Sequence, residues 1–177
     1  MTHGLILYGA PASGKDTVTT ALTELDGRFH LYERLKAGPG REMGYRMVTP
    51  GELDRLANRG EILWQNSRYG ARYAIDRPEL SRLFQQGSIP VVHAGQPEVV
   101  AAVSIAIDAV NWTVIELRCS RATAEARIIA RRTGDTPERL AAWDATPRLT
   151  NADLVIDTDS TTPGEAARRV DAAVCAR

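Results

Sequence analysis

The stretch that decides the fold is Gly9-Ala10-Pro11-Ala12-Ser13-Gly14-Lys15, which follows a short apolar run at 4–8. Its spacing fits the pattern G-x-x-x-x-G-K, in which successive backbone N–H groups wrap a phosphate and glycines allow the close approach. Apolar residues at helical spacing from Lys15 to Leu25 predict a helix directly after it. The helix N-terminus favours the same anion. The order strand, loop, helix predicts that a nucleoside triphosphate binds by its phosphates. The predicted ATP-binding residues are Gly9, Ala10, Pro11, Ala12, Ser13, Gly14, Lys15, Asp16 and Thr17.

The position after Lys15, where the motif usually has Ser or Thr, is Asp16, followed by Thr17. A hydroxyl at this position normally contacts Mg²⁺, and a carboxylate can do the same because magnesium prefers oxygen ligands. Asp16 is equally explained as an acidic residue that the helix dipole favours in a first turn, and the two roles are compatible. We therefore expect ATP with Mg²⁺, with Asp16 as the candidate metal ligand.

Length and composition indicate one soluble globular domain of 177 residues, with 44% hydrophobic and 25% charged residues. Lys+Arg and Asp+Glu balance at 22 each, so no basic field favours a nucleic-acid partner. Two cysteines, Cys119 and Cys175, make no disulfide framework. The apolar runs at 5–8 and 99–110 are too short for a signal peptide or a membrane span. We expect a cytoplasmic protein without a membrane partner; the sequence does not indicate an oligomeric state.

Predicted strands and helices alternate along the chain. The segment 36–44, rich in Gly and Pro, is predicted as a loop. Thr49-Pro50-Gly51-Glu52 and Thr162-Pro163-Gly164-Glu165 both have the capping-box pattern of a helix start. The alternation favours a parallel sheet with helices on both faces. Strands are expected at 4–8, 29–32, 61–65, 72–75, 89–93, 113–117 and 153–156, and helices at 15–25, 50–58, 77–86, 98–110, 122–132, 137–143 and after Thr162.

Further motifs follow the phosphate loop in a definite order: Arg34-Leu-Lys36-Ala-Gly38, Gly44-Tyr45-Arg-Met-Val-Thr49, Gly60-Glu61-Ile62-Leu63-Trp64, Tyr69-Gly-Ala-Arg-Tyr73 and the strand from Gly87 to His93. In this order and spacing the chain resembles the guanylate kinases over nearly its whole length. The resemblance implies an α/β fold, the three-layer sandwich of P-loop NTPases with a parallel sheet. It divides the chain into a core at 1–30, 87–120 and 147–177, an acceptor-binding insert at about 31–86 and a short arginine-rich lid at about 121–146.

The resemblance implies that the phosphate of the acceptor is held by Arg34, Lys36, Tyr45 and Tyr73. Lys36 replaces an arginine, so a point charge stands in place of a bidentate fork. The residue types alone would equally fit solvated loop charges and half-buried strand aromatics.

The positions that read guanine in that family differ here: they hold Trp64, Ile75, His93 and Gly95. Acidic and hydroxyl groups would pair with the N–H donors of guanine, and a buried guanine edge without partners is costly. We therefore expect an acceptor other than GMP. Trp64 could stack on a ring or pack in the core, and His93 could contact the acceptor or be a hydrogen-bonded structural residue.

Two features resemble the ribose 1,5-bisphosphate phosphokinases of the same superfamily. These are Gly14-Lys15-Asp16-Thr17 and the strand Val91-Val92-His93-Ala94-Gly95, which lacks an acidic pair. That resemblance implies an acceptor without a purine base. The loop from Gly38 to Tyr45, by contrast, has the length found in guanylate kinases.

An arginine-rich segment follows the strand at 113–117, and it includes Arg127 and Arg131 four positions apart on one predicted helix face. The resemblance places Arg127, Arg131 or Arg132, and Arg139 in a mobile lid. With Lys15, these arginines are the predicted catalytic residues, since phosphoryl transfer depends on positive charge around the moving group. A solvated, arginine-rich surface helix is the alternative.

These observations favour an ATP- and Mg²⁺-dependent phosphotransferase that acts on a small phosphorylated acceptor, with ribose 1,5-bisphosphate or an unusual nucleotide ahead of GMP. A phosphate acceptor needs no strong general base, which fits the lack of an obvious one. The alternatives are a guanylate or other nucleoside monophosphate kinase, a catalytically inactive guanylate kinase-like binding module, and a regulatory NTPase switch. The intact Gly14-Lys15 pair disfavours the binding module.

Overall fold

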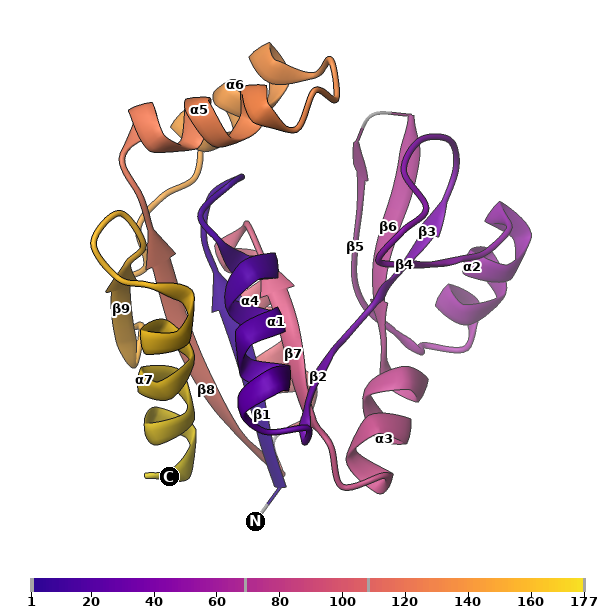
Figure 1. Ribbon diagram of the computed structural model, residues 1–177. Coiled ribbons are helices and arrows are strands. Elements are labelled where there is room, and N and C mark those ends of the chain that lie inside the picture. Colours follow the sequence, from indigo (N-terminus) through magenta and orange to yellow (C-terminus); the bar gives the residue numbers. More distant parts are fainter. Residues whose placement is uncertain (1, 69, 108, 177) are drawn as a thin grey trace.

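A parallel five-stranded sheet forms the centre of the computed structural model, which describes residues 2–68, 70–107 and 109–176 (Figure 1). Tyr69 of the motifs above, and Asp108, lie outside the described residues. Each neighbouring pair of strands in this sheet runs parallel, as the alternation of elements predicts. In spatial order the strands are β2 (Phe29–Leu31), β7 (Ile89–Ala94), β1 (Thr2–Tyr8), β8 (Val110–Arg118) and β9 (Leu154–Asp157).

Helices cover both faces of this sheet. Leu5 and Leu7 of β1 pack with α1 (Lys15–Leu25) and α7 (Pro163–Cys175) on one face. Ile6 and Tyr8 pack with α3 (Arg77–Gln85) and α4 (Pro97–Ala106) on the other. All four side chains are fully buried, because a parallel sheet is covered on both sides and alternate residues enter opposite cores. No helix of the described residues is long and apolar enough to cross a membrane.

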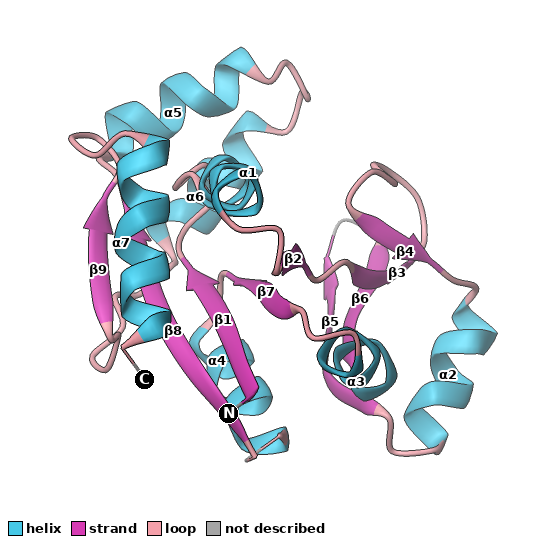
Figure 2. Cartoon of the chain, turned by 60° about the horizontal axis from the view of Figure 1, so that its bottom comes forward, coloured by secondary structure: helices cyan, strands magenta, loops and turns pink. Residues whose placement is uncertain are grey.

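A second, four-stranded sheet lies beside the first and is built from the segment between β2 and α3 (Figure 2). Its strands, in spatial order, are β4 (Tyr45–Met47), β3 (Arg34–Ala37), β6 (Ala71–Asp76) and β5 (Ile62–Arg68). The helix α2 (Pro50–Asn58) packs on it through Leu53, which is fully buried against Leu35 and Ala74. The capping box is present: Thr49 Oγ1 accepts a hydrogen bond from Glu52 N, and Glu52 Oε2 accepts one from Thr49 N.

A buried ionic network joins the two sheets where the chain passes between them. The Tyr32 hydroxyl donates to Asp76 Oδ1 at 2.6 Å and accepts from Asp76 N at 2.9 Å. Arg46 of β4 donates to both the Asp76 carboxylate and the Tyr32 hydroxyl. Asp76 also caps α3 by accepting from Glu79 N. Tyr32 precedes β3 and Asp76 ends β6, so the network restrains both connections to the second sheet.

Two helices, α5 (Arg121–Ala130) and α6 (Thr136–Asp144), lie above the phosphate-loop end of the parallel sheet (Figure 1). Arg121 of α5 donates to Asp144 of α6 at 2.9 Å. Ala12 of the phosphate loop packs with Ile128 of α5 and Trp143 of α6. The loop and the two helices therefore form one contact region.

Two of the expectations for secondary structure were wrong, and one strand was missed. The predicted loop 36–44 begins later, because Lys36 and Ala37 belong to β3 and pair with β6. β4, which pairs in parallel with β3, was not anticipated. The helix predicted at 98–110 ends at Ala106, and Val110 instead starts β8 opposite Thr2. In each case pairing with a distant strand decides the conformation over local residue preference.

Candidate active site

A cleft of about 760 Å³ opens between the phosphate loop, the second sheet and the α5–α6 pair. Most of the residues predicted as a site from the sequence line it. They are Gly9, Pro11, Ala12, Ser13, Gly14, Lys15 and Asp16 of the phosphate loop, Arg34, Lys36, Tyr45, Tyr73 and His93 of the predicted acceptor set, and Arg131 and Arg139 of the predicted lid.

The phosphate loop has the tight backbone that its glycines permit. Gly14 has φ of +100°, a left-handed conformation that favours glycine. A Cβ on Gly9 would lie 2.6 Å from the Leu117 carbonyl oxygen, so no side chain fits there. The Thr158 hydroxyl donates to the Ser13 carbonyl at 3.0 Å, which connects the loop to the end of β9.

Lys15 folds over this loop. Its Nζ donates to the carbonyl oxygens of Gly9 at 2.6 Å and Ala10 at 3.0 Å. The pKa of Lys15 is lowered to about 8, mainly by burial; the charge of Asp16 opposes this shift, and those of Arg34 and Arg131 add to it. An anion bound in the loop would stabilise the charged ammonium.

Asp16 and His93 meet at the floor of the cleft. The Oδ1 atom of Asp16 lies 3.6 Å from His93 Nδ1, and its Oδ2 atom lies 4.0 Å from Arg131. On its other side, His93 Nε2 is hydrogen-bonded to Thr19 Oγ1 at 2.7 Å. Burial and the charge of Lys15 lower the pKa of His93 to about 3, so the imidazole is neutral near pH 7.

The donor set fits a magnesium ion held mainly by phosphates. Asp16 offers a hard oxygen ligand whose side chain is 61% exposed and lines the cleft beside Lys15. Among the described residues no group of three or more His, Cys, Asp or Glu side chains could hold a metal ion. Mg²⁺ commonly binds through one or two carboxylates, substrate phosphates and water, so a single carboxylate suffices.

Lys36 forms the centre of a second cationic site, on the far side of the cleft. Its side chain is only 1% exposed, and Nζ donates to the Arg41 carbonyl oxygen at 2.7 Å. The ammonium lies 5.5 Å from the ring centroid of Tyr45 and 5.8 Å from that of Tyr73. Within the described part of the chain no carboxylate pairs with Lys36 in a salt bridge. A buried ammonium of this kind is suited to an incoming anion.

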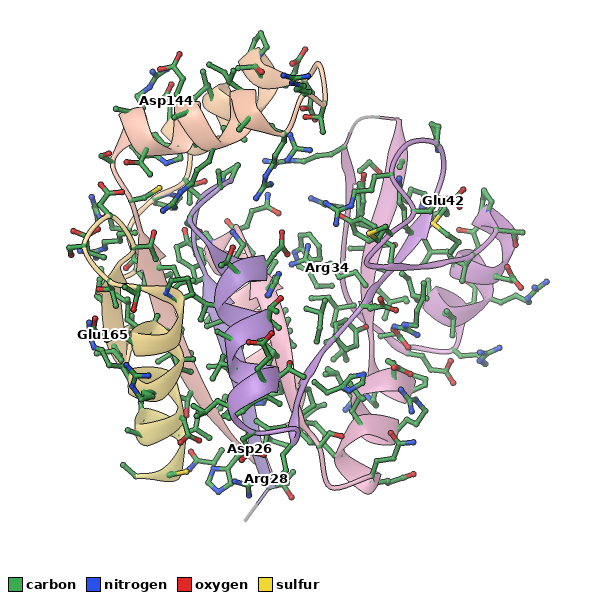
Figure 3. All side chains as sticks on the ribbon, viewed as in Figure 1. Asp26, Arg28, Arg34, Glu42, Asp144 and Glu165 are labelled. Carbon is green, nitrogen blue, oxygen red and sulfur yellow. The ribbon has the colours of Figure 1, made fainter. Side chains whose placement is uncertain are left out.

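Arg34 lies between the two sheets, as Figure 3 shows. It donates to the carbonyl oxygen of His93, and its guanidinium lies 5.1 Å from the ring centroid of Trp64. Trp64 packs against the core beneath α3 and α4. The structure therefore accounts for Trp64 as a packing residue that also orients Arg34.

The arginines predicted as a lid separate into three groups. Arg131 and Arg139 line the cleft, and Arg139 pairs with Asp135 at 2.8 Å. Arg127 instead donates to the carbonyl oxygen of Ala12 at 3.0 Å and to Thr158, so it contacts the back of the phosphate loop. Arg132 is exposed, has φ of +51° and is not among the residues that line the cleft.

Solved structures with a similar fold were found by comparison. Guanylate kinase from Anaplasma phagocytophilum matches with a TM-score of 0.63 over 99% of this chain and 85% of that chain, at 16% identity. The structure of APE1195 matches with a TM-score of 0.60 over 99% of this chain and 96% of that one, also at 16% identity. The protein has the guanylate kinase-like P-loop fold. No protein-family model and no curated protein sequence matches the chain.

Within this guanylate kinase-like fold, a second cavity of about 380 Å³ lies behind the phosphate loop. It is lined by Thr17, Arg127, Thr158 and Pro163, together with Gly14 and Arg131, which also line the cleft. Thr17 was predicted with the phosphate ligands, but its side of α1 faces this second cavity.

Two residues with amide side chains line the cleft but were not predicted as site residues from the sequence. Asn66 Nδ2 donates to Gln96 Oε1 at 3.3 Å, and both residues line the cleft. Asn66 is two positions after Trp64 on a strand and so shares its face. Gln96 follows the carboxyl end of β7, the edge where parallel sheets commonly bind ligands. Both positions were therefore accessible to sequence reasoning.

Proposed function

We propose that this protein is an ATP- and Mg²⁺-dependent phosphotransferase that transfers a phosphoryl group to a phosphate of a small phosphorylated acceptor. The observation that carries the proposal is that one cleft holds both cationic sites, Lys15 in the phosphate loop and Lys36 between two tyrosines. A donor and an acceptor phosphate would thereby face each other. In this assignment residues 31–86 form the acceptor-binding insert and residues 121–146 the lid.

The donor half fits ATP. The phosphate loop and the N-terminus of α1 would hold the phosphates. The 380 Å³ cavity behind Gly14 is open to the nucleoside, with Thr158 and Arg127 on its wall. Mg²⁺ held by Asp16 would neutralise charge on the donor phosphates.

The acceptor half needs only to hold and orient a phosphate. Lys36, Tyr45 and Tyr73 would bind the acceptor so that one of its phosphate oxygens attacks the terminal phosphorus of ATP. A new P–O bond forms, the bond to the β-phosphate oxygen breaks, and ADP leaves. Arg131 and Arg139 are placed to neutralise the charge that develops on the equatorial oxygens. A phosphate nucleophile needs no general base.

The charges in the cleft favour an anionic acceptor, and among the described residues the second sheet lines the cleft with no carboxylate that could pair with guanine. Its carboxylates, Asp16 and Asp135, belong to the phosphate loop and the α5–α6 pair. The second sheet and its loops contribute cations to the lining, namely Arg34, Lys36, Arg41 and Arg68. An acceptor such as ribose 1,5-bisphosphate or an unusual nucleotide fits this lining better than GMP. A guanylate or other nucleoside monophosphate kinase is the alternative.

One assay tests the proposal. The protein is incubated with ATP, Mg²⁺ and one acceptor from a panel of GMP, AMP, dTMP, CMP, ribose 1,5-bisphosphate and ribose 5-phosphate, and ADP is measured. Turnover with a phosphorylated acceptor, abolished in Lys15→Ala at unchanged melting temperature, supports it. Preferred turnover of GMP would overturn the preference for a base-free acceptor. ATP binding without turnover of any acceptor would favour a binding module.

A further inference from the structure

His93 is the side chain of the cleft floor for which the proposed transfer gives no role, although it is in contact with three separate elements. It is the penultimate residue of β7 and pairs with Leu7 of the neighbouring β1. Its Nε2 meets Thr19 of α1, its Nδ1 faces Asp16 at the first turn of the same helix, and its backbone carbonyl accepts from Arg34.

We propose that His93 is a positioning residue that orients the Asp16 carboxylate toward the magnesium ion of the donor, with Thr19 holding the imidazole in the required tautomer. The proposal rests on the proposed function for the presence of Mg²⁺·ATP, but not on the identity of the acceptor.

The polarity of the contacts supports this arrangement. A neutral imidazole carries one N–H, and an ionised carboxylate can only accept. The proton therefore belongs on Nδ1, which lies in electrostatic contact with Asp16 Oδ1 at 3.6 Å, just beyond hydrogen-bond distance, and Nε2 then accepts from the Thr19 hydroxyl at 2.7 Å. Thr19 is only 4% exposed, so few alternative partners from solvent compete for its hydroxyl. A second element that fixes the tautomer of a ligand-orienting histidine is a common device around metal sites.

The two carboxylate oxygens of Asp16 therefore have different partners. Oδ1 lies beside the imidazole Nδ1, whereas Oδ2 lies 4.0 Å from the guanidinium of Arg131, a residue that lines the cleft. Oδ2 is thus the oxygen that a cation approaches. With 61% of the Asp16 side chain exposed, His93 and Arg131 are the only ion-pair partners of its carboxylate among the described residues. Loss of the imidazole N–H would leave the carboxylate free to rotate away.

Two isosteric replacements separate the two faces of the imidazole. His93→Asn places an amide N–H at the position of Nδ1 and loses the contact at Nε2. His93→Gln reaches the position of Nε2 and loses the N–H at Nδ1. Thr19→Val removes the hydroxyl at constant shape, and Thr19→Ser retains it.

The experiment measures ATP binding by calorimetry across a range of Mg²⁺ concentrations, with EDTA as the metal-free reference. We expect His93→Gln to require about tenfold more Mg²⁺ for half-maximal enhancement of ATP affinity, equivalent to about 1.4 kcal/mol. His93→Asn should stay within about threefold of the wild type, and Thr19→Val should lie between the two. Affinity in EDTA should be unchanged in all variants, and Thr19→Ser should behave as the wild type.

A double-mutant cycle shows whether His93 acts through Asp16. In the Asp16→Asn background, His93→Gln should have no further effect on the Mg²⁺ requirement, whereas an unrelated structural role would give additive effects. A wild-type Mg²⁺ requirement in folded His93→Gln, or additive effects in the cycle, would overturn the inference. If the wild-type protein binds Mg²⁺·ATP but phosphorylates no acceptor, the proposed function fails and this inference is still decided by the binding data. If ATP affinity does not depend on Mg²⁺ at all, both fail.

Discussion

The guanidinium of Arg127 donates a hydrogen bond at 3.0 Å to the carbonyl oxygen of Ala12, a residue 115 positions earlier in the chain. Ala12 has φ of +61°, a conformation that non-glycine residues seldom adopt. The contact therefore supports a strained turn of the phosphate loop from behind. The resemblance to guanylate kinases places Arg127 in a mobile lid, but in this structure Arg127 contacts and supports the phosphate loop.

Replacing Arg127 tests that role. We expect Arg127→Ala to lower ATP affinity by roughly tenfold, since hydrogen bonds from a charged donor contribute about 1.5–3 kcal/mol and the loop loses the one to Ala12. Calorimetric titration with ATP measures the change. Arg132→Ala is the matched control, because Arg132 is exposed and outside both cavities. Equal affinities of the two variants would contradict the assignment.

The pKa of Lys15 predicts a pH dependence of ATP binding. In the ligand-free protein, Lys15 loses its proton at about pH 8, whereas bound phosphates would keep it charged. Above pH 8 binding must then take up a proton, so affinity falls as pH rises, by up to about tenfold per unit. Below pH 8 the lysine is already charged and contributes no pH dependence.

Calorimetry at pH 8.5 in two buffers of different ionisation enthalpy measures this proton uptake. Lys15→Arg is the control, since a guanidinium stays charged throughout and should show no uptake. The same uptake in both proteins would assign the proton to another group.

Asp76 is expected to contribute strongly to stability. Asp76→Asn keeps a side chain that can cap α3 but leaves the Arg46 guanidinium without its carboxylate partner. We expect a loss of about 2–3 kcal/mol, less than for a fully buried pair because the Arg46 side chain retains 28% exposure. Urea denaturation measures the difference. In the exposed pair Arg59–Glu61, Glu61→Gln should change stability by less than about 0.5 kcal/mol. Comparable losses at both sites would show that the network does not restrain the junction.

The close approach of the backbone at Gly9 of the phosphate loop can be tested by substitution, with Gly27, outside the loop, as the control. A Cβ on Gly9 would clash with the Leu117 carbonyl oxygen at 2.6 Å, and a backbone atom cannot move aside as a side chain does. We expect Gly9→Ala to abolish detectable ATP binding and to lower the melting temperature. A Cβ on Gly27 would meet nothing within 4 Å, so Gly27→Ala should leave both unchanged. ATP binding by Gly9→Ala would show that the loop can relax.

The sequence by itself determined the elements that depend on neighbouring residues. Residues 4–8 predicted the first strand, and the segment from Gly9 to Leu25 predicted the phosphate loop and α1. Both α1 and α2 have the predicted bounds. The caps at Thr49 and Thr162 were also predicted correctly. These features were predictable because glycine conformation, N-terminal capping and apolar periodicity act over a few residues.

Tertiary structure alone decided how the site is assembled. Lys36 was expected in a loop but is buried in β3, because a distant strand pairs with it and two tyrosine rings cover its ammonium. Thr19 and His93, 74 positions apart, meet only where α1 packs beside the end of β7. Arg127 and Arg131 lie four positions apart, yet Arg127 donates to the Ala12 carbonyl oxygen behind the phosphate loop, whereas Arg131 also lines the cleft, 4.0 Å from Asp16. Such contacts depend on how distant segments pack together, a relation that no local pattern of residues encodes.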